Sequence, residues 1–114
     1  MKTEKIASEL NAEIMVKTND ENINAGYTSD MLSEVIANAG DSMAWITLQM
    51  HMNVVAVAQL KKIPLIVLTG KAQPAPEVLQ AAAEKGLNVM RSGFDSFQTS
   101  GRLYKLLVSS EPEK

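Results

Sequence analysis

The sequence of 114 residues contains no cysteine, one histidine, one tryptophan, two tyrosines and two phenylalanines. The lack of cysteine excludes a disulfide scaffold, a thiolate nucleophile and cysteine-ligated zinc or iron–sulfur centres. With a single histidine, no second imidazole can complete a zinc site, so we expect no metal. Eleven Lys+Arg stand against 13 Asp+Glu. We therefore expect no nucleic-acid partner, which would need a basic face and aromatic side chains on which bases stack.

Long apolar runs are also missing. The longest, residues 54–58, is far shorter than the roughly 20 residues that cross a membrane. We expect no signal peptide at residues 1–5. These features predict a soluble, cytoplasmic protein without a membrane partner.

Glycine-rich phosphate-binding motifs do not occur. Thr69-Gly70-Lys71 resembles the end of a phosphate loop, but Leu65 stands where that loop needs its first glycine, and Ala72 follows the lysine. The dinucleotide-binding glycine pattern is absent as well. We therefore expect no cofactor.

Hydrophobic residues make up 46% of the chain, and Ala, Val, Leu, Ile and seven Met supply most of them. Such small and branched side chains are typical of α/β domains, where helices pack closely on a sheet. The length suits one domain, which we place at residues 1–108, followed by a flexible tail at 109–114. Helices are predicted at 5–10, 30–39, 53–60, 77–85 and 95–107, and strands at 13–16, 23–27, 44–48, 65–68 and 87–90.

The alternation of strands and helices predicts a small, mostly parallel sheet flanked by helices on both faces, in three layers. Within these elements, Asp30 is expected in the first turn of its helix and Asn53 at the N-cap of the next. Gly26 is expected where a side chain would be unwelcome. The last helix is expected to bury Phe97, Leu103, Tyr104 and Leu107.

Polar residues follow the predicted strands at their carboxyl ends, which is where open parallel sheets bind ligands. This rim is the candidate ligand site. Its residues are Ser29, Asp30, Gln49, His51, Asn53, Thr69 and Gly70.

His51 admits two interpretations. It can serve as a general base, a phosphoryl acceptor or a metal ligand, with Asp30 as its orienting partner. Alternatively, it is a helix-entry residue bonded to backbone or placed in a subunit interface, and Asp30 is an acid favoured by the helix dipole. Ser29 does not complete a catalytic triad, because no nucleophile-elbow motif surrounds it.

Two segments, 26–35 (GYTSDMLSEV) and 45–58 (WITLQMHMNVVAVA), resemble the DRTGG domain. This module is related to the N-terminal domain of bacterial HPr kinase/phosphorylase, and the resemblance covers residues 3 to 107. Of the stretch that names the family, which corresponds to residues 22–26 (NINAG), only Gly26 survives. The resemblance implies a three-layer α/β fold like that of the HPr kinase N-terminal domain. It also implies a regulatory module, often beside CBS domains in regulated pyrophosphatases, with subunit association and no established catalysis.

Together these inferences predict a stand-alone regulatory or interaction module and not an enzyme. We expect it to form a homodimer, with the Met- and Val-rich segment 50–58 at the interface, and to sense a small molecule such as a nucleotide, or a protein partner, at the rim. The alternative is a small enzyme or phosphotransfer protein that uses His51 with Asp30.

Overall fold

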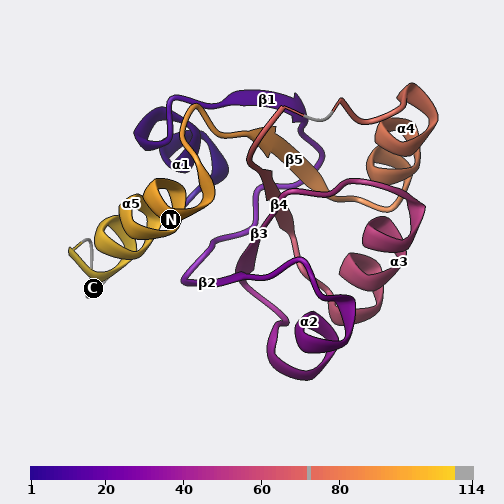
Figure 1. Ribbon diagram of the computed structural model, residues 1–114, viewed down its shortest axis with the longest axis horizontal. Coiled ribbons are helices and arrows are strands. Elements are labelled where there is room, and N and C mark those ends of the chain that lie inside the picture. Colours follow the sequence, from indigo (N-terminus) through magenta and orange to yellow (C-terminus); the bar gives the residue numbers. More distant parts are fainter. Residues whose placement is uncertain (72, 110–114) are drawn as a thin grey trace.

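The computed structural model describes residues 1–71 and 73–109. Over these residues the chain alternates between short helices and strands, close to the predicted segments (Figure 1). In chain order the elements are α1 (Thr3–Glu9), β1 (Glu13–Val16), β2 (Ala25–Thr28), α2 (Leu32–Asn38), β3 (Met43–Thr47), α3 (Met52–Lys61), β4 (Leu65–Leu68), α4 (Pro76–Glu84), β5 (Asn88–Arg91) and α5 (Ser96–Ser109).

The strands form one sheet in the order β1-β5-β4-β3-β2. Strands β2 to β5 are parallel neighbours, and β1 joins the far edge antiparallel to β5. Strand β4, at the centre, is buried at all four positions, as expected for a strand covered on both faces. The predicted α/β fold with a mostly parallel sheet is therefore confirmed.

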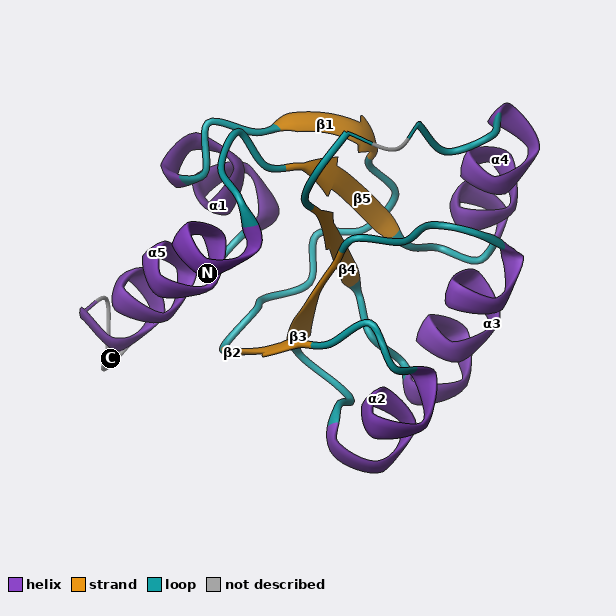
Figure 2. Ribbon diagram, in the orientation of Figure 1, coloured by secondary structure: helices purple, strands orange, loops and turns teal. Residues whose placement is uncertain are grey.

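Helices cover both faces of the sheet (Figure 2), with α2, α3 and α4 on one side and α1 and α5 on the other. Because side chains alternate along a strand, Trp45 and Ile66 pack with the first group. Ile46 and Val67 pack with the second group. The predicted three-layer arrangement is confirmed.

Part of the segment 50–58 belongs to the core of its own subunit, whereas residues 51–53 and Ala56 are exposed. Val54, Val55, Val57 and Ala58 are buried on helix α3 against the sheet, so their burial within the subunit accounts for the Val-rich pattern that suggested an interface. The expected N-cap is also wrong, because the helix begins at Met52 and His51 occupies the N-cap position.

Helix α2 begins later than predicted. It starts at Leu32 with Met31 at the N-cap position, so Asp30 precedes the helix and does not lie in its first turn. The reason is that the Asp30 carboxylate accepts hydrogen bonds from strand β3. At the other end of helix α2, Ala39 is the C-cap residue with an extended backbone, and Gly40 follows it.

Helix α5 buries a different face from the one expected. Leu103 and Thr99 are buried and Leu107 is half-buried, but Phe97 is 87% exposed and Tyr104 is 72% exposed. The expectation that Phe97 and Tyr104 are buried was wrong. Ser109, assigned above to the tail, is the last residue of this helix, and residues 110–114 lie outside the described part of the chain.

Asn88, at the start of β5, is fully buried. Its Oδ1 accepts hydrogen bonds from the backbone N–H groups of Thr18 (2.6 Å) and Asn19 (3.1 Å). Its Nδ2 donates to Thr3 Oγ1 at 2.9 Å and to Asn19 O at 3.0 Å. One side chain thus joins β5, helix α1 and the connection between β1 and β2.

The same connection carries an exposed ion-pair cluster. The Lys17 ammonium group lies 2.6 Å from Asp20 Oδ1 and 3.3 Å from Glu4 Oε2. Its hydrogen bond to Asp20 raises the pKa of Lys17 and lowers the pKa of the Asp20 carboxyl group. Because these groups are exposed, the cluster orients the connection without contributing much stability.

Candidate functional site

The carboxyl ends of β2 and β3 meet at Asp30. Its Oδ1 accepts hydrogen bonds from Thr47 Oγ1 at 2.6 Å and from the Leu48 N–H at 2.8 Å. Gln49 Nε2 donates to the Asp30 carbonyl at 2.6 Å, and Gln49 Oε1 lies 3.1 Å from His51 Nε2. We call Asp30, Thr47, Gln49 and His51 the rim cluster.

Ser29 supports this cluster from one side. Its Oγ accepts a hydrogen bond from the Met31 N–H at 3.0 Å and donates to Glu34 Oε1 at 3.0 Å. Its carbonyl accepts a 2.9 Å hydrogen bond from the indole N–H of Trp45. The buried Trp45 therefore fixes the turn that carries Asp30.

Thr69 and Gly70 lie one strand further along the rim. The Thr69 N–H donates to the Thr47 carbonyl at 3.0 Å, and Thr69 Oγ1 lies 2.6 Å from Ser96 Oγ. The Gly70 carbonyl accepts a 2.8 Å hydrogen bond from Arg91. Strand β4 leads to α4 on one face and β5 leads to α5 on the other, which is the divergence at which open sheets form a crevice. The Arg91 guanidinium and the paired hydroxyls occupy that position.

The seven predicted residues therefore do not form one site. Asp30, Gln49 and His51 are connected through hydrogen bonds, and Thr69 joins them through Thr47. Ser29 precedes Asp30 in the chain and bonds to Met31, Glu34 and Trp45 instead. Asn53 is exposed in the first turn of α3, and Gly70 contacts Arg91. Thr47 was not among the predicted residues. A polar residue at the end of an otherwise apolar strand is the sequence feature that could have identified it.

Exposed apolar residues flank the rim cluster in the sequence. Met31 and Leu48 are adjacent in sequence to Asp30 and Gln49, and Met52 follows His51; all three are at least half exposed. A fixed polar cluster with apolar flanks suits the binding of a ligand that has both a polar edge and an apolar face.

The catalytic alternative requires a hydrogen bond between His51 and Asp30. In the structure, Gln49 bridges His51 and the Asp30 backbone carbonyl, and Oδ1 of the Asp30 carboxylate accepts hydrogen bonds from Thr47 and Leu48. Within the described residues, no three His, Cys, Asp or Glu side chains are placed to hold a metal ion. Also within these ranges, no helix is both long and apolar enough to cross a membrane.

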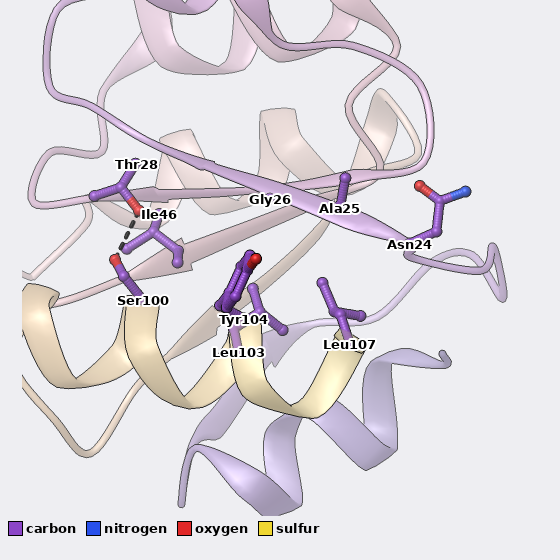
Figure 3. A pocket seen from close by; sticks show the side chains of 9 residues that line it. All are labelled: Asn24, Ala25, Gly26, Thr28, Ile46, Ser100, Leu103, Tyr104 and Leu107. Carbon is purple, nitrogen blue, oxygen red and sulfur yellow. Dashed lines mark hydrogen bonds between the residues drawn. The ribbon is translucent and has the colours of Figure 1, made fainter. Parts of the chain in front are cut away.

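A separate groove of about 360 Å³ runs between strand β2 and helix α5 (Figure 3). The two elements run in opposite directions, with Ser100 beside Thr28 and Leu107 toward Asn24. The hydroxyl groups of Thr28 and Ser100 lie 2.7 Å apart and link the two elements at one end. Tyr104 lies midway along the groove.

Residues 5–106 match the family model of the DRTGG domain. The chain belongs to the DRTGG domain family. The resemblance inferred from the sequence is thereby confirmed over nearly the same range. No curated protein matches the sequence.

Among solved structures, the DRTGG chain is similar to the CBS and DRTGG domains of the regulatory region of Clostridium perfringens pyrophosphatase. That structure contains the activator diadenosine tetraphosphate. The TM-score is 0.70 at 19% sequence identity, and the similarity covers 97% of this chain. It covers 47% of the chain in that structure, so this chain spans about half of its length. At this identity the similarity establishes a shared fold.

Gly26, the one residue retained from the stretch that names the DRTGG family, lies on β2 under helix α5. A Cβ added there would lie 3.3 Å from Leu103 Cδ2 and 3.4 Å from the Ala44 carbonyl oxygen. Both distances are tight for a Cβ atom, in agreement with the prediction that a side chain is unwelcome at Gly26. The glycine allows α5 to pack closely on the edge strand.

Replacing Gly26 by valine is expected to lower the free energy of unfolding by about 2 kcal/mol, because the added atoms crowd Leu103 and the Ala44 carbonyl where α5 packs on the edge strand. Urea denaturation followed by circular dichroism measures this change. Gly40→Ala is the control, since its added Cβ lies 3.8 Å from the nearest atom. A G26V protein as stable as the G40A protein would contradict the close-packing role.

Proposed function

We propose that this DRTGG domain is a non-catalytic regulatory module that associates with a second copy of itself and binds a small ligand, of the nucleotide class, at the rim cluster. The observation that carries the proposal is the hydrogen-bonded arrangement of Asp30, Gln49 and His51 beside exposed apolar side chains. Polar groups held in place by protein partners recognise a ligand without reorganisation.

The arrangement favours binding over chemistry. A general base needs a free path to the proton it removes and a partner that orients its ring. His51 is paired with the neutral amide of Gln49, and the Asp30 carboxylate accepts two protein hydrogen bonds. These partners position the groups as donors and acceptors for a ligand.

The choice of ligand class is supported by the structural neighbour. Its regulatory region was solved with the activator diadenosine tetraphosphate, and it holds CBS domains in addition to the DRTGG domain. An adenine base has the apolar face and polar edge that the flanking Met31, Leu48 and Met52 and the rim cluster would accommodate.

A thermal-shift experiment with diadenosine tetraphosphate, ATP and a sugar phosphate tests the ligand part of the proposal. At about 100 times its Kd, a ligand stabilises the native state by about 2.7 kcal/mol, which raises Tm by on the order of 10 °C. We expect this rise in the wild-type protein and its loss in Gln49→Ala, which interrupts the rim cluster. Gln80→Ala, an exposed glutamine on helix α4, is the matched control. No rise with any of the three compounds, or an equal rise in the Q49A and Q80A proteins, counts against the proposal.

His51 distinguishes the proposed function from the phosphotransfer alternative, which requires a phosphate on its imidazole ring. Because His51 is exposed and hydrogen-bonded to one neutral side chain, His51→Gln is expected to change the free energy of unfolding by less than about 0.5 kcal/mol. The H51Q protein should also keep the oligomeric state of the wild type. Mass spectrometry that finds an acid-labile phosphate on His51 would overturn the non-catalytic proposal.

A further inference from the structure

Helix α5 carries an exposed apolar stripe that its own subunit does not cover. Phe97 is 87% exposed, Tyr104 is 72% exposed and Val108 is 50% exposed. With Gly101, these residues are spaced by four, three and four positions, which places them on one side of a helix. The stripe extends for about 16 Å along the helix axis. We call Phe97, Gly101, Tyr104 and Val108 the α5 stripe.

Gly101 is unexplained within the subunit. Glycine inside a helix is destabilising relative to alanine, and it usually occurs there because of a positive φ or a close neighbour. Gly101 is helical, and a Cβ added there would have no atom within 4 Å. At Gly26, by contrast, an added Cβ would lie 3.3 Å from Leu103 Cδ2. The open space at Gly101 faces outward, where only another molecule can use it.

The stripe is complementary to itself. Phe97 and Val108 lie equally far from the midpoint between Arg102 and Leu103, and so do Gly101 and Tyr104. When two such helices pack antiparallel about a two-fold axis at that midpoint, Phe97 meets Val108 of the partner subunit. The side chain of Tyr104 then enters the space left by Gly101 of the partner subunit. Each contact then occurs twice, as in any two-fold interface, and the large side chain of Tyr104 faces the residue without a side chain.

The surroundings of the stripe also favour a second copy. None of its four residues is charged, so antiparallel pairing brings no like charges together within it. Arg102 is held away from it by a 3.3 Å hydrogen bond to Glu9 and lies over the Phe94 ring. The groove beside Tyr104 continues the apolar surface to the edge strand β2, whose outer side has no neighbouring strand within the described residues.

We propose that two copies of this chain associate through antiparallel packing of their α5 stripes, with each Tyr104 seated against Gly101 of the partner subunit. This inference rests on the self-association part of the proposed function and assigns its surface. It places the interface on the opposite face of the sheet from helix α3, which holds most of the segment 50–58.

Sedimentation equilibrium of the full chain at micromolar concentration tests the interface. The wild type is expected at twice the chain mass of 12.4 kDa. Gly101→Glu improves helix propensity and its Cβ has no atom of its own subunit within 4 Å, so the G101E protein should remain folded by circular dichroism. It is expected to raise the dimer dissociation constant by on the order of a hundredfold, because it puts a charge against Tyr104 of the partner subunit. Gln98→Glu adds the same charge to the same helix outside the stripe and should leave the dimer intact.

A pair of opposite charges, introduced at positions 101 and 104, tests whether these two positions face each other across the two-fold axis. Tyr104→Lys alone should dissociate the dimer as G101E does. The protein that carries both G101E and Y104K should recover the dimer, because each introduced glutamate then faces an introduced lysine of the other copy. A G101E protein that dimerises like the wild type, or a double variant as dissociated as the single ones, would overturn the proposed interface while self-association stands. A monomeric wild type would overturn both the interface and the self-association part of the proposed function.

Discussion

Replacing Asn88 by alanine is expected to lower the free energy of unfolding by about 3 kcal/mol. The side chain is fully buried and makes hydrogen bonds to Thr3, Thr18 and Asn19. Its removal leaves two backbone N–H groups and a threonine hydroxyl group without their partner, and unsatisfied buried polar groups are more costly than the lost bonds alone. It also releases helix α1 and the connection between β1 and β2 from β5.

Urea denaturation of the N88A protein, followed by circular dichroism, measures this loss. Asn53→Ala is the control, because Asn53 is exposed on helix α3, where alanine is a better helix former. The control should change stability by less than about 0.5 kcal/mol. A loss below about 1 kcal/mol for N88A would mean that water or other protein groups replace the Asn88 hydrogen bonds.

Replacing Trp45 by alanine is expected to cost about 4 kcal/mol, the loss typical of removing a buried aromatic side chain and leaving a cavity. Trp45 is fully buried on strand β3 and packs in the cluster that joins the sheet to α2, α3 and α4. The same change removes the indole hydrogen bond to the Ser29 carbonyl, which fixes the turn preceding Asp30. We therefore expect the W45A protein to lose both stability and ligand binding at the rim.

Two further variants separate these effects. Trp45→Phe keeps an aromatic ring in the core but removes the hydrogen bond, and it should lower stability by about 2 kcal/mol. Leu60→Ala removes a large apolar side chain that is exposed on helix α3, and it should have little effect. If W45A and L60A have similar midpoints in urea, Trp45 does not organise the core as described.

The order and type of the elements could be predicted because their patterns are local. The strand at residues 65–68 is an uninterrupted apolar run and has the predicted bounds. The segment 53–60 is rich in β-branched residues, yet it is helical because its burial against the sheet outweighs strand propensity. Helix starts were less predictable, since Asp30 bonds to β3 rather than to the helix that follows it.

The face that α5 buries could not be predicted from hydrophobicity. Thr99 is fully buried because its hydroxyl group lies 2.7 Å from Ser92 Oγ and donates to the Phe94 carbonyl. Such paired polar groups are buried at little cost. The larger apolar residues, Phe97 and Tyr104, remain exposed. A rule that assigns every aromatic residue to the core of its own chain cannot anticipate such positions, which lie in the interface that we propose.

The rim could be predicted in location but not in detail. Because parallel strands end at the same edge of the sheet, residues following β2 and β3 had to lie near one another. The hydrogen bonds that select Asp30, Gln49 and His51 and leave Asn53 outside depend on side-chain geometry that spacing does not encode. Asn88 was missed for the same reason, although a polar residue between Leu87 and Val89 was a local signal.

The central claim is that a nucleotide binds at the rim cluster. The most direct test is a ¹H–¹⁵N NMR titration of the full chain with diadenosine tetraphosphate and, separately, with ATP. Binding at the rim predicts saturable shifts of the backbone amides of Leu48, Gln49 and His51, with weaker effects elsewhere. No saturable shifts with either nucleotide, or shifts confined to residues of the groove between β2 and α5, would contradict it.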